Sequence, residues 1–285
     1  MRSVLNDSSR RPLAVLGVVL ICVSWCEGQT SEPRAAEAPE VEATRRFQAH
    51  AKEIAAAHVL HIGQADGRKL DLLADPILRW ANPLGGKRAH GEVFLWTDRG
   101  RPAVVLSLNE YTDAKGALHE EHEWHSLASQ AVTSVGPDGW APTVAGIAFQ
   151  PLPDAEPPAD SPARRLRQMR ELAARFSGEK TTRAKETRDL RLLPQPAFRY
   201  EIKEQDQDIL DGALFALVEA NDPEVFLILQ AQASGPAQAW HYALARMESL
   251  RVAVSYRGQR LWEAPTLPAQ EVYNRTDKPY AAFLR

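Results

Sequence analysis

Two segments of the chain carry apolar residues at helical spacing. Phe47, Ala51 and Ala55 form one apolar stripe, which predicts an amphipathic helix. Residues 162–176 carry a second stripe, and Ser161 stands where it can cap the first turn. Shorter apolar runs bounded by turn residues follow each stripe. The pattern therefore predicts a helix followed by antiparallel strands, twice along the chain.

Several of the predicted strands are apolar at every position. Val93-Phe94-Leu95-Trp96 and Val225-Phe226-Leu227-Ile228-Leu229 have no polar face, so both faces of these strands must be covered. A helix on one face of the sheet and a second sheet on the other would cover them. Asp98-Arg99-Gly100-Arg101 and Arg257-Gly258 each separate two apolar runs and predict hairpin turns.

The two predicted segments also share residues in the same order. Leu70-Asp71-Leu72-Leu73 corresponds to Leu190-Arg191-Leu192-Leu193, and the same near-constant offset relates three further pairs: Arg79-Trp80 and Arg199-Tyr200, Gly91 and Gly212, and Trp124-His125 and Trp240-His241. We therefore predict an α+β fold of two tandem similar units, each one helix packed on an antiparallel β-meander. Cystatin-like and NTF2-like folds are the nearest analogies, and such folds support many functions.

The sequence predicts five consecutive regions. They are a signal peptide at 1–28, a disordered leader at 29–42, a first α+β unit at 43–150, a proline-rich linker at 151–161 and a second α+β unit at 162–285.

The amino-terminal region has the pattern of an export signal. Arginines precede an apolar run from Leu13 to Trp25, which is shorter than the ~20 residues of a spanning helix. Cleavage after Gly28 would remove both cysteines, Cys22 and Cys26, and with them any disulfide or cysteine-ligated metal. The Sec and twin-arginine routes both remain open, and bulky Trp25 argues against a lipoprotein. We expect a mature chain without a transmembrane span, located in the periplasm, in the cell envelope or outside the cell.

Composition excludes some classes of function. The 285 residues are 44% hydrophobic and 25% charged, as in ordinary globular proteins. The net charge is -3 and no long basic run occurs, so we expect no nucleic-acid partner. A small molecule, a glycan or an envelope protein remain as classes of ligand.

The segment His119-Glu120-Glu121-His122-Glu123-Trp124-His125 concentrates chemically versatile side chains. It lacks the spacing of the helical HExxH zinc motif. On a strand, His119 and His125 would share one face and His122 would lie on the other. The candidate metal ligands are His119, His122, His125 and Glu123, with zinc as the possible cofactor. The favoured alternative is a polar loop and strand edge that needs no cofactor.

Two pairs of positions are candidates for ligand binding. Trp124-His125 and Trp240-His241 could line a pocket, because a tryptophan face stacks well on sugars and aromatic ligands. Arg79 and Arg199 could each hold an anion. The alternatives are that the tryptophans belong to the core and that each arginine pairs with an acid such as Asp71 or Glu201, or extends its charged end to solvent at a sheet edge.

The pattern resembles a group of secreted bacterial proteins of unknown function. Its members have a Pro-x-x-Arg-aromatic segment, a Phe-Leu-Trp strand and a His-rich strand ending in His-Ser-Leu; here these are Pro76 to Trp80, Phe94 to Trp96 and Glu121 to Leu127. The resemblance covers most of the mature chain and implies no activity.

No catalytic signature such as GxSxG or a P-loop occurs in the chain. The sequence therefore favours a secreted or periplasmic, non-enzymatic binding or structural protein over an enzyme. The alternative is an extracytoplasmic metal-dependent hydrolase that uses the 119–125 segment.

Overall fold

The structure is a computed structural model that describes residues 37–82, 89–113, 115–200, 208–234 and 237–285. The predicted signal peptide and most of the predicted leader lie outside these residues. Helix α1 (Glu37–Ala56) begins inside the 29–42 segment, so the end of that segment is helical. Contacts divide the chain into residues 1–43 and 44–285, and the description below concerns the second unit.

A first sheet contains six antiparallel strands in the order β18-β7-β6-β5-β3, with β4 also paired to β5. Its strands are β3 (Asp71–Leu72), β4 (Leu78–Asn82), β5 (Ala89–Asp98), β6 (Arg101–Thr112), β7 (Leu118–Ser126) and β18 (Tyr280–Leu284). Beside it, β1 (Val59–Ile62) pairs with β2 (Arg68–Lys69) and β8 (Val132–Val135) in a small antiparallel sheet.

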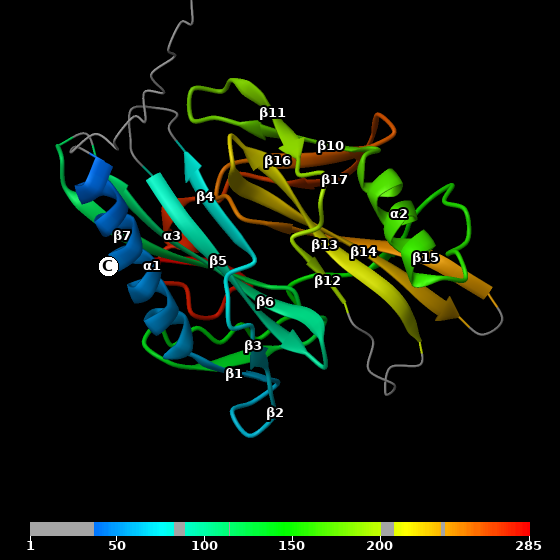
Figure 1. The fold of residues 1–285 in the computed structure, drawn as a ribbon, viewed down its shortest axis with the longest axis horizontal. Helices are drawn as coiled ribbons and strands as arrows, with labels where there is room; N and C mark the ends of the chain where they lie inside the picture. Colours follow the sequence, from blue (N-terminus) through cyan, green and yellow to red (C-terminus); the bar gives the residue numbers. More distant parts are fainter. Residues whose placement is uncertain (1–36, 83–88, 114, 201–207, 235–236) are drawn as a thin grey trace, which may run out of the picture. The chain divides into compact units, whose positions relative to one another are not determined.

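A second sheet contains nine antiparallel strands in the order β17-β16-β10-β11-β13-β14-β15-β9, with β12 also paired to β13. Its eight-strand path curls into an open half-barrel (Figure 1). The strands are β9 (Gln150–Pro151), β10 (Phe176–Thr181), β11 (Thr187–Leu192), β12 (Phe198–Arg199), β13 (Ile209–Glu219), β14 (Asp222–Ser234), β15 (Ala237–Arg246), β16 (Val252–Tyr256) and β17 (Gln259–Ala264).

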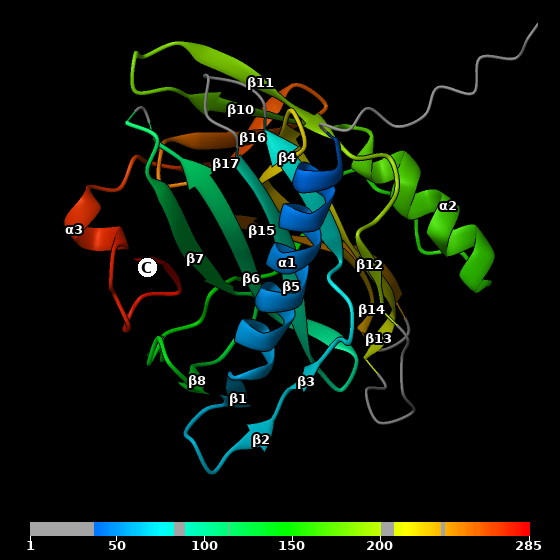
Figure 2. The ribbon, with the colours of Figure 1, turned by 60° about the vertical axis from the view of Figure 1, so that its left-hand side comes forward.

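Both predicted helices form, together with a short third one. Phe47, Ala51 and Ala55 of α1 are buried against the first sheet, and Figure 2 shows α1 running along β5. Helix α2 (Pro162–Ala173) begins after Ser161, whose side chain accepts a hydrogen bond from the backbone of Arg164. Helix α3 spans Ala269–Val272. Among the described residues, no helix is long and apolar enough to cross a membrane.

The fully apolar strands serve two cores at once, because their side chains alternate between faces. On β5, Phe94 and Trp96 join Phe47 of α1 in one core. Val93 and Leu95 join a second core, which contains residues of β13 and β14 from the other sheet. A third core lies between the second sheet and α2. The predicted covering by a helix on one face and a sheet on the other is confirmed, and each fully buried Phe or Leu contributes ~1.5–3 kcal/mol.

Both predicted hairpins also form. Strands β5 and β6 are joined by Arg99 and Gly100, at φ 53° and 88°, and β16 and β17 by Arg257 and Gly258, at φ 50° and 78°. Glycine adopts this left-handed conformation without steric cost, which is why the two-residue turns close tightly.

Each half of the chain gives a strand to the sheet of the other half. Strand β9, which follows the first-half strands, pairs with β15, and β18, at the far end of the sequence, pairs with β7. The sequence predicted one antiparallel meander in each half and did not predict this exchange. The short strands carry no periodicity that would identify a partner so distant in sequence.

Candidate functional site

A charged cavity of about 530 Å³ lies between the first and second sheets. Strands β6, β7, β10 and β14 contribute to its wall, as do α3 and β18. Its charged lining residues are Glu121, Glu123, Lys180, Arg183, Arg188, Glu219, Asp222, Glu224 and Glu248. Carboxyl groups therefore outnumber basic groups, and the volume suits a small-molecule ligand.

Strand alternation explains how β7 serves both this cavity and the helix-side core. Glu121 and Glu123 line the cavity, whereas Trp124 belongs to the core beneath α1. Strand β7 lies between β6 and β18. The predicted alternation is thus confirmed, but the 119–125 segment is a strand paired on both sides and not the polar loop and strand edge that we favoured.

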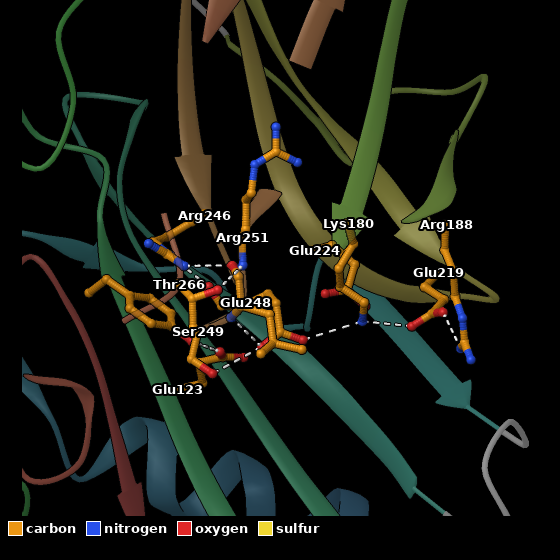
Figure 3. A network of polar contacts seen from close by, with 12 residues as sticks. Glu123, Lys180, Arg188, Glu219, Glu224, Arg246, Glu248, Ser249, Arg251 and Thr266 are labelled. Carbon is orange, nitrogen blue, oxygen red and sulfur yellow. Dashed lines mark hydrogen bonds and ion pairs between the residues drawn. The ribbon is translucent and has the colours of Figure 1, made fainter. Parts of the chain in front are cut away.

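Lys180 is the central cation of the cavity (Figure 3). Its Nζ lies 2.5 Å from Glu224 Oε1, 2.6 Å from Glu219 Oε2 and 3.3 Å from Glu248 Oε2. Burial alone would lower the pKa of Lys180, but these carboxylates outweigh burial and raise it. Glu219 is also bound by Arg188, at 2.8 Å. Lys180 and Arg188 are therefore already committed to carboxylates.

The turn after β15 is held by its own polar contacts. Glu248 Oε1 accepts hydrogen bonds from the backbone of Leu250, at 3.0 Å, and from the Ser249 hydroxyl, at 3.1 Å. Buried Arg246 donates to the carbonyl oxygens of Glu248 and Leu250, at 2.6 and 2.7 Å. These bonds fix the Glu248 carboxylate at the cavity edge, beside Lys180 (Figure 3).

Three further carboxyl groups face the cavity without a cation. Glu121 is hydrogen-bonded by Tyr273 and Asn109, Glu123 by Tyr280, and Asp222 by Asn82. In the described part of the chain, none of the three forms an ion pair.

The environment of these groups favours their neutral forms. Burial raises the pKa of Asp222 to about 7, although Lys180 opposes the shift. Burial and the neighbouring Glu121 raise the pKa of Glu123 well above its ordinary value, and burial and Glu248 raise that of Glu121. These three buried carboxyl groups therefore keep their protons to a higher pH than exposed carboxyl groups do.

Each of the two arginines predicted to bind a ligand forms an ion pair with a carboxylate. Arg79 Nε lies 2.6 Å from Glu92 Oε1. Arg199 donates twice to Asp211, from Nε at 3.1 Å and from its terminal nitrogen at 2.7 Å. These contacts agree with the alternative of an arginine paired with an acid. The partners are Glu92 and Asp211; Arg79 does not use Asp71, and Glu201 lies outside the described residues.

The two Trp-His pairs lie in different surroundings. Trp124 and Trp240 are 0% and 2% exposed and belong to separate cores. His125 is buried, donates from Nδ1 to the carbonyl of Ser126 at 2.7 Å, and has its pKa lowered to about 4 by burial. His241 is half-buried.

Strand pairing does not support the match between the two Trp-His pairs. Trp124 lies opposite Leu106, whereas Trp240 lies opposite Ala231. The offset that relates Gly91 to Gly212 would relate Leu106 to Leu227, which pairs with Leu244. A two-residue motif was too short to fix the alignment.

The four predicted metal ligands do not come together. His119 contacts Asp113 at 3.1 Å, and Glu123 contacts Tyr280. His125 lies on the opposite face of β7 from His122. Among the residues that the structure describes, His122 alone of the four belongs to a group that could hold a metal ion, and its companions are His58 and Asp138.

The sequence did not identify the residues that organise the charged cavity or those that surround His122. Lys180 and Glu224 are separated by 44 positions, and no local motif surrounds either. His58 lies two residues after the end of α1, and Asp138 lies in the loop after β8. Of these four residues, only His58 interrupts an apolar run of the sequence.

Comparisons with protein-family models, curated proteins and solved structures found no match. The resemblance to the group of secreted bacterial proteins therefore stays a prediction.

Proposed function

We propose that this protein is an exported, non-enzymatic binding protein whose cavity takes a small organic cation. The observation that carries the proposal is the excess of carboxyl groups in the cavity: Glu121, Glu123 and Asp222 have hydrogen-bonding neighbours and form no ion pair among the described residues. A buried carboxylate is stable when it is paired and otherwise takes up a proton.

An ammonium group would replace those protons. It could donate to two or three carboxylates at once, and such charge-assisted hydrogen bonds are about twice as strong as neutral ones. Trp80, Tyr111 and Tyr273 also line the cavity, and aromatic faces attract organic cations. An amine with a short apolar body therefore fits this lining better than an anion or a hydrocarbon.

Calorimetric titration with putrescine at neutral pH tests the proposal, with butanediol as a neutral molecule of similar size. Replacing Glu123→Gln together with Asp222→Asn should weaken putrescine binding about 10-fold or more. Glu171→Gln, on the exposed surface of α2, is the matched control and should leave binding unchanged. Equal affinity for the diol, or no binding of either compound, would contradict the proposal.

The alternative of a metal-dependent hydrolase has less support. In the described part of the chain, His122 is the single member of the predicted set that lies in a group able to hold a metal. His58, His122 and Asp138 are only 3%, 3% and 6% exposed. A substrate would need a rearrangement to reach an ion held there, which makes binding the better-supported function.

We also infer that the two halves arose by duplication. The support is a repeated pairing pattern: β5 pairs with β3, β4 and β6, and β13 with β11, β12 and β14. A Cβ added at Gly91 would lie 2.6 Å from the ring of Trp80, and one at Gly212 would lie 2.5 Å from the ring of Tyr200. Superposing residues 43–143 on 163–266 should align the helix and at least three strands.

A further inference from the structure

His58, His122 and Asp138 converge beneath α1, away from the charged cavity. His122 Nδ1 lies 2.9 Å from Asp138 Oδ2, and His58 Nε2 lies 3.5 Å from the same oxygen. The three ligand atoms lie within 4.8 Å of one another. Zinc bonds to nitrogen and carboxylate oxygen are ~2.0–2.2 Å long, so one ion could contact all three atoms after small adjustments.

The outer nitrogen of each histidine is held by a hydrogen-bonding partner. His122 Nε2 lies 2.9 Å from Glu120 Oε1, and His58 Nδ1 lies 3.2 Å from the Ser134 hydroxyl. Such outer contacts fix the ring orientation and tautomer of metal-binding histidines. Here they direct His58 Nε2 and His122 Nδ1 toward Asp138.

A second observation points to a missing partner. His58 Nε2 is fully buried and has no hydrogen-bond partner, and the His58 side chain is 0% exposed. A buried polar atom without a partner costs ~1–3 kcal/mol. A cation between His58 and Asp138 would satisfy this atom.

Two other groups hold the Asp138 carboxylate. Trp124 Nε1 donates to Oδ2 at 2.9 Å, and the Arg285 guanidinium donates to Oδ1. His122 would have to give up its Nδ1 proton to bind an ion beside Oδ2. The Arg285 side chain is 41% exposed, so it can move toward solvent as a metal cation enters.

We propose that His58, His122 and Asp138 form a binding site for one divalent transition-metal ion of the zinc class. Two imidazole nitrogens and one carboxylate suit zinc, cobalt or nickel, whereas calcium and magnesium favour all-oxygen sites. The ion would tie the end of α1, strand β7 and the loop after β8 together. Because all three ligands are buried, its role is structural.

Titration of the full chain with Zn²⁺ by calorimetry, after treatment with a chelator, tests the site. One ion should bind per chain, and His58→Gln and Asp138→Asn should each weaken binding about 100-fold or more. His119→Gln, on the other face of β7, and Glu123→Gln, in the charged cavity, should leave zinc binding unchanged. Zinc binding that persists in His58→Gln, or that is lost in Glu123→Gln, would overturn the assignment.

A measurement on the unmodified protein covers the case in which these variants fail to fold. X-ray absorption of the zinc-loaded wild-type chain should show a nitrogen and oxygen shell with two imidazole rings. Cobalt should also quench tryptophan fluorescence, because Trp124 packs 4.8 Å from the His58 ring, centroid to centroid. A wild-type chain that binds no zinc, or a zinc shell with fewer than two imidazoles, refutes the site.

Discussion

Replacing Lys180 with methionine should destabilise the protein strongly. Lys180 is 6% exposed and Glu224 is 3% exposed, so Lys180→Met leaves a carboxyl buried without its cation. Removing one partner of a buried ion pair costs about 3–5 kcal/mol. Glu219 keeps Arg188, so the loss concentrates on Glu224. The double variant Lys180→Met/Glu224→Gln should therefore recover at least half of the lost stability.

The loss should also depend on pH. Burial and Glu248 already raise the pKa of Glu224, and removing Lys180 would raise it further. A carboxyl with a raised folded pKa binds a proton that the unfolded chain releases above its own, lower pKa, so its stability contribution falls as pH rises. The deficit of Lys180→Met should thus be smaller in mild acid than at alkaline pH.

Equilibrium urea unfolding, followed by tryptophan fluorescence, measures both effects. Trp96, Trp124 and Trp140 are almost completely buried, so unfolding will change the emission. Lys69→Met, at an exposed position of β2, is the control and should change stability by less than about 0.5 kcal/mol. A loss below about 1 kcal/mol, or a double variant no more stable than Lys180→Met, would refute the reasoning.

Three other outcomes are expected. Trp124→Phe should cost about 1–3 kcal/mol more than Trp240→Phe in urea unfolding, because Trp124 donates to Asp138 whereas Trp240 Nε1 has no partner; equal costs would contradict the hydrogen bond. Stability should fall as pH rises toward about 7, because burial raises the pKa of Asp222 to about 7, and Asp222→Asn should flatten this slope in chemical unfolding across pH. Intact-mass measurement of envelope-fraction protein should give an amino terminus at or near Gln29, and a product that retains the first residues would exclude cleavage.

Features with local causes could be predicted from the sequence. The apolar stripe of 162–176 and the cap at Ser161 gave α2, and the Arg-Gly dipeptide at 257–258 gave a hairpin. Runs such as 225–229, apolar at every position, predicted burial on both faces. Each of these depends on neighbours within a few residues.

Features that depend on distant pairing could not be predicted. Asp138 meets His122 across 16 positions and Arg285 across 147, and the spacing carries no periodic pattern. Three histidines close together made the 119–125 segment a candidate metal site. Strand alternation separated them, and a lone histidine after α1 supplied the second imidazole.

The exchange of strands between the halves has a consequence for how the chain is made. Until residues 280–284 leave the ribosome, β7 has no neighbour on one side, and its backbone donors and acceptors stay open to other chains. Pairing across so long a stretch of sequence is slow. The newly synthesised polypeptide therefore passes through an aggregation-prone stage, which a chaperone or prompt export would have to cover. Cutting the gene between the halves would make that exposed edge permanent.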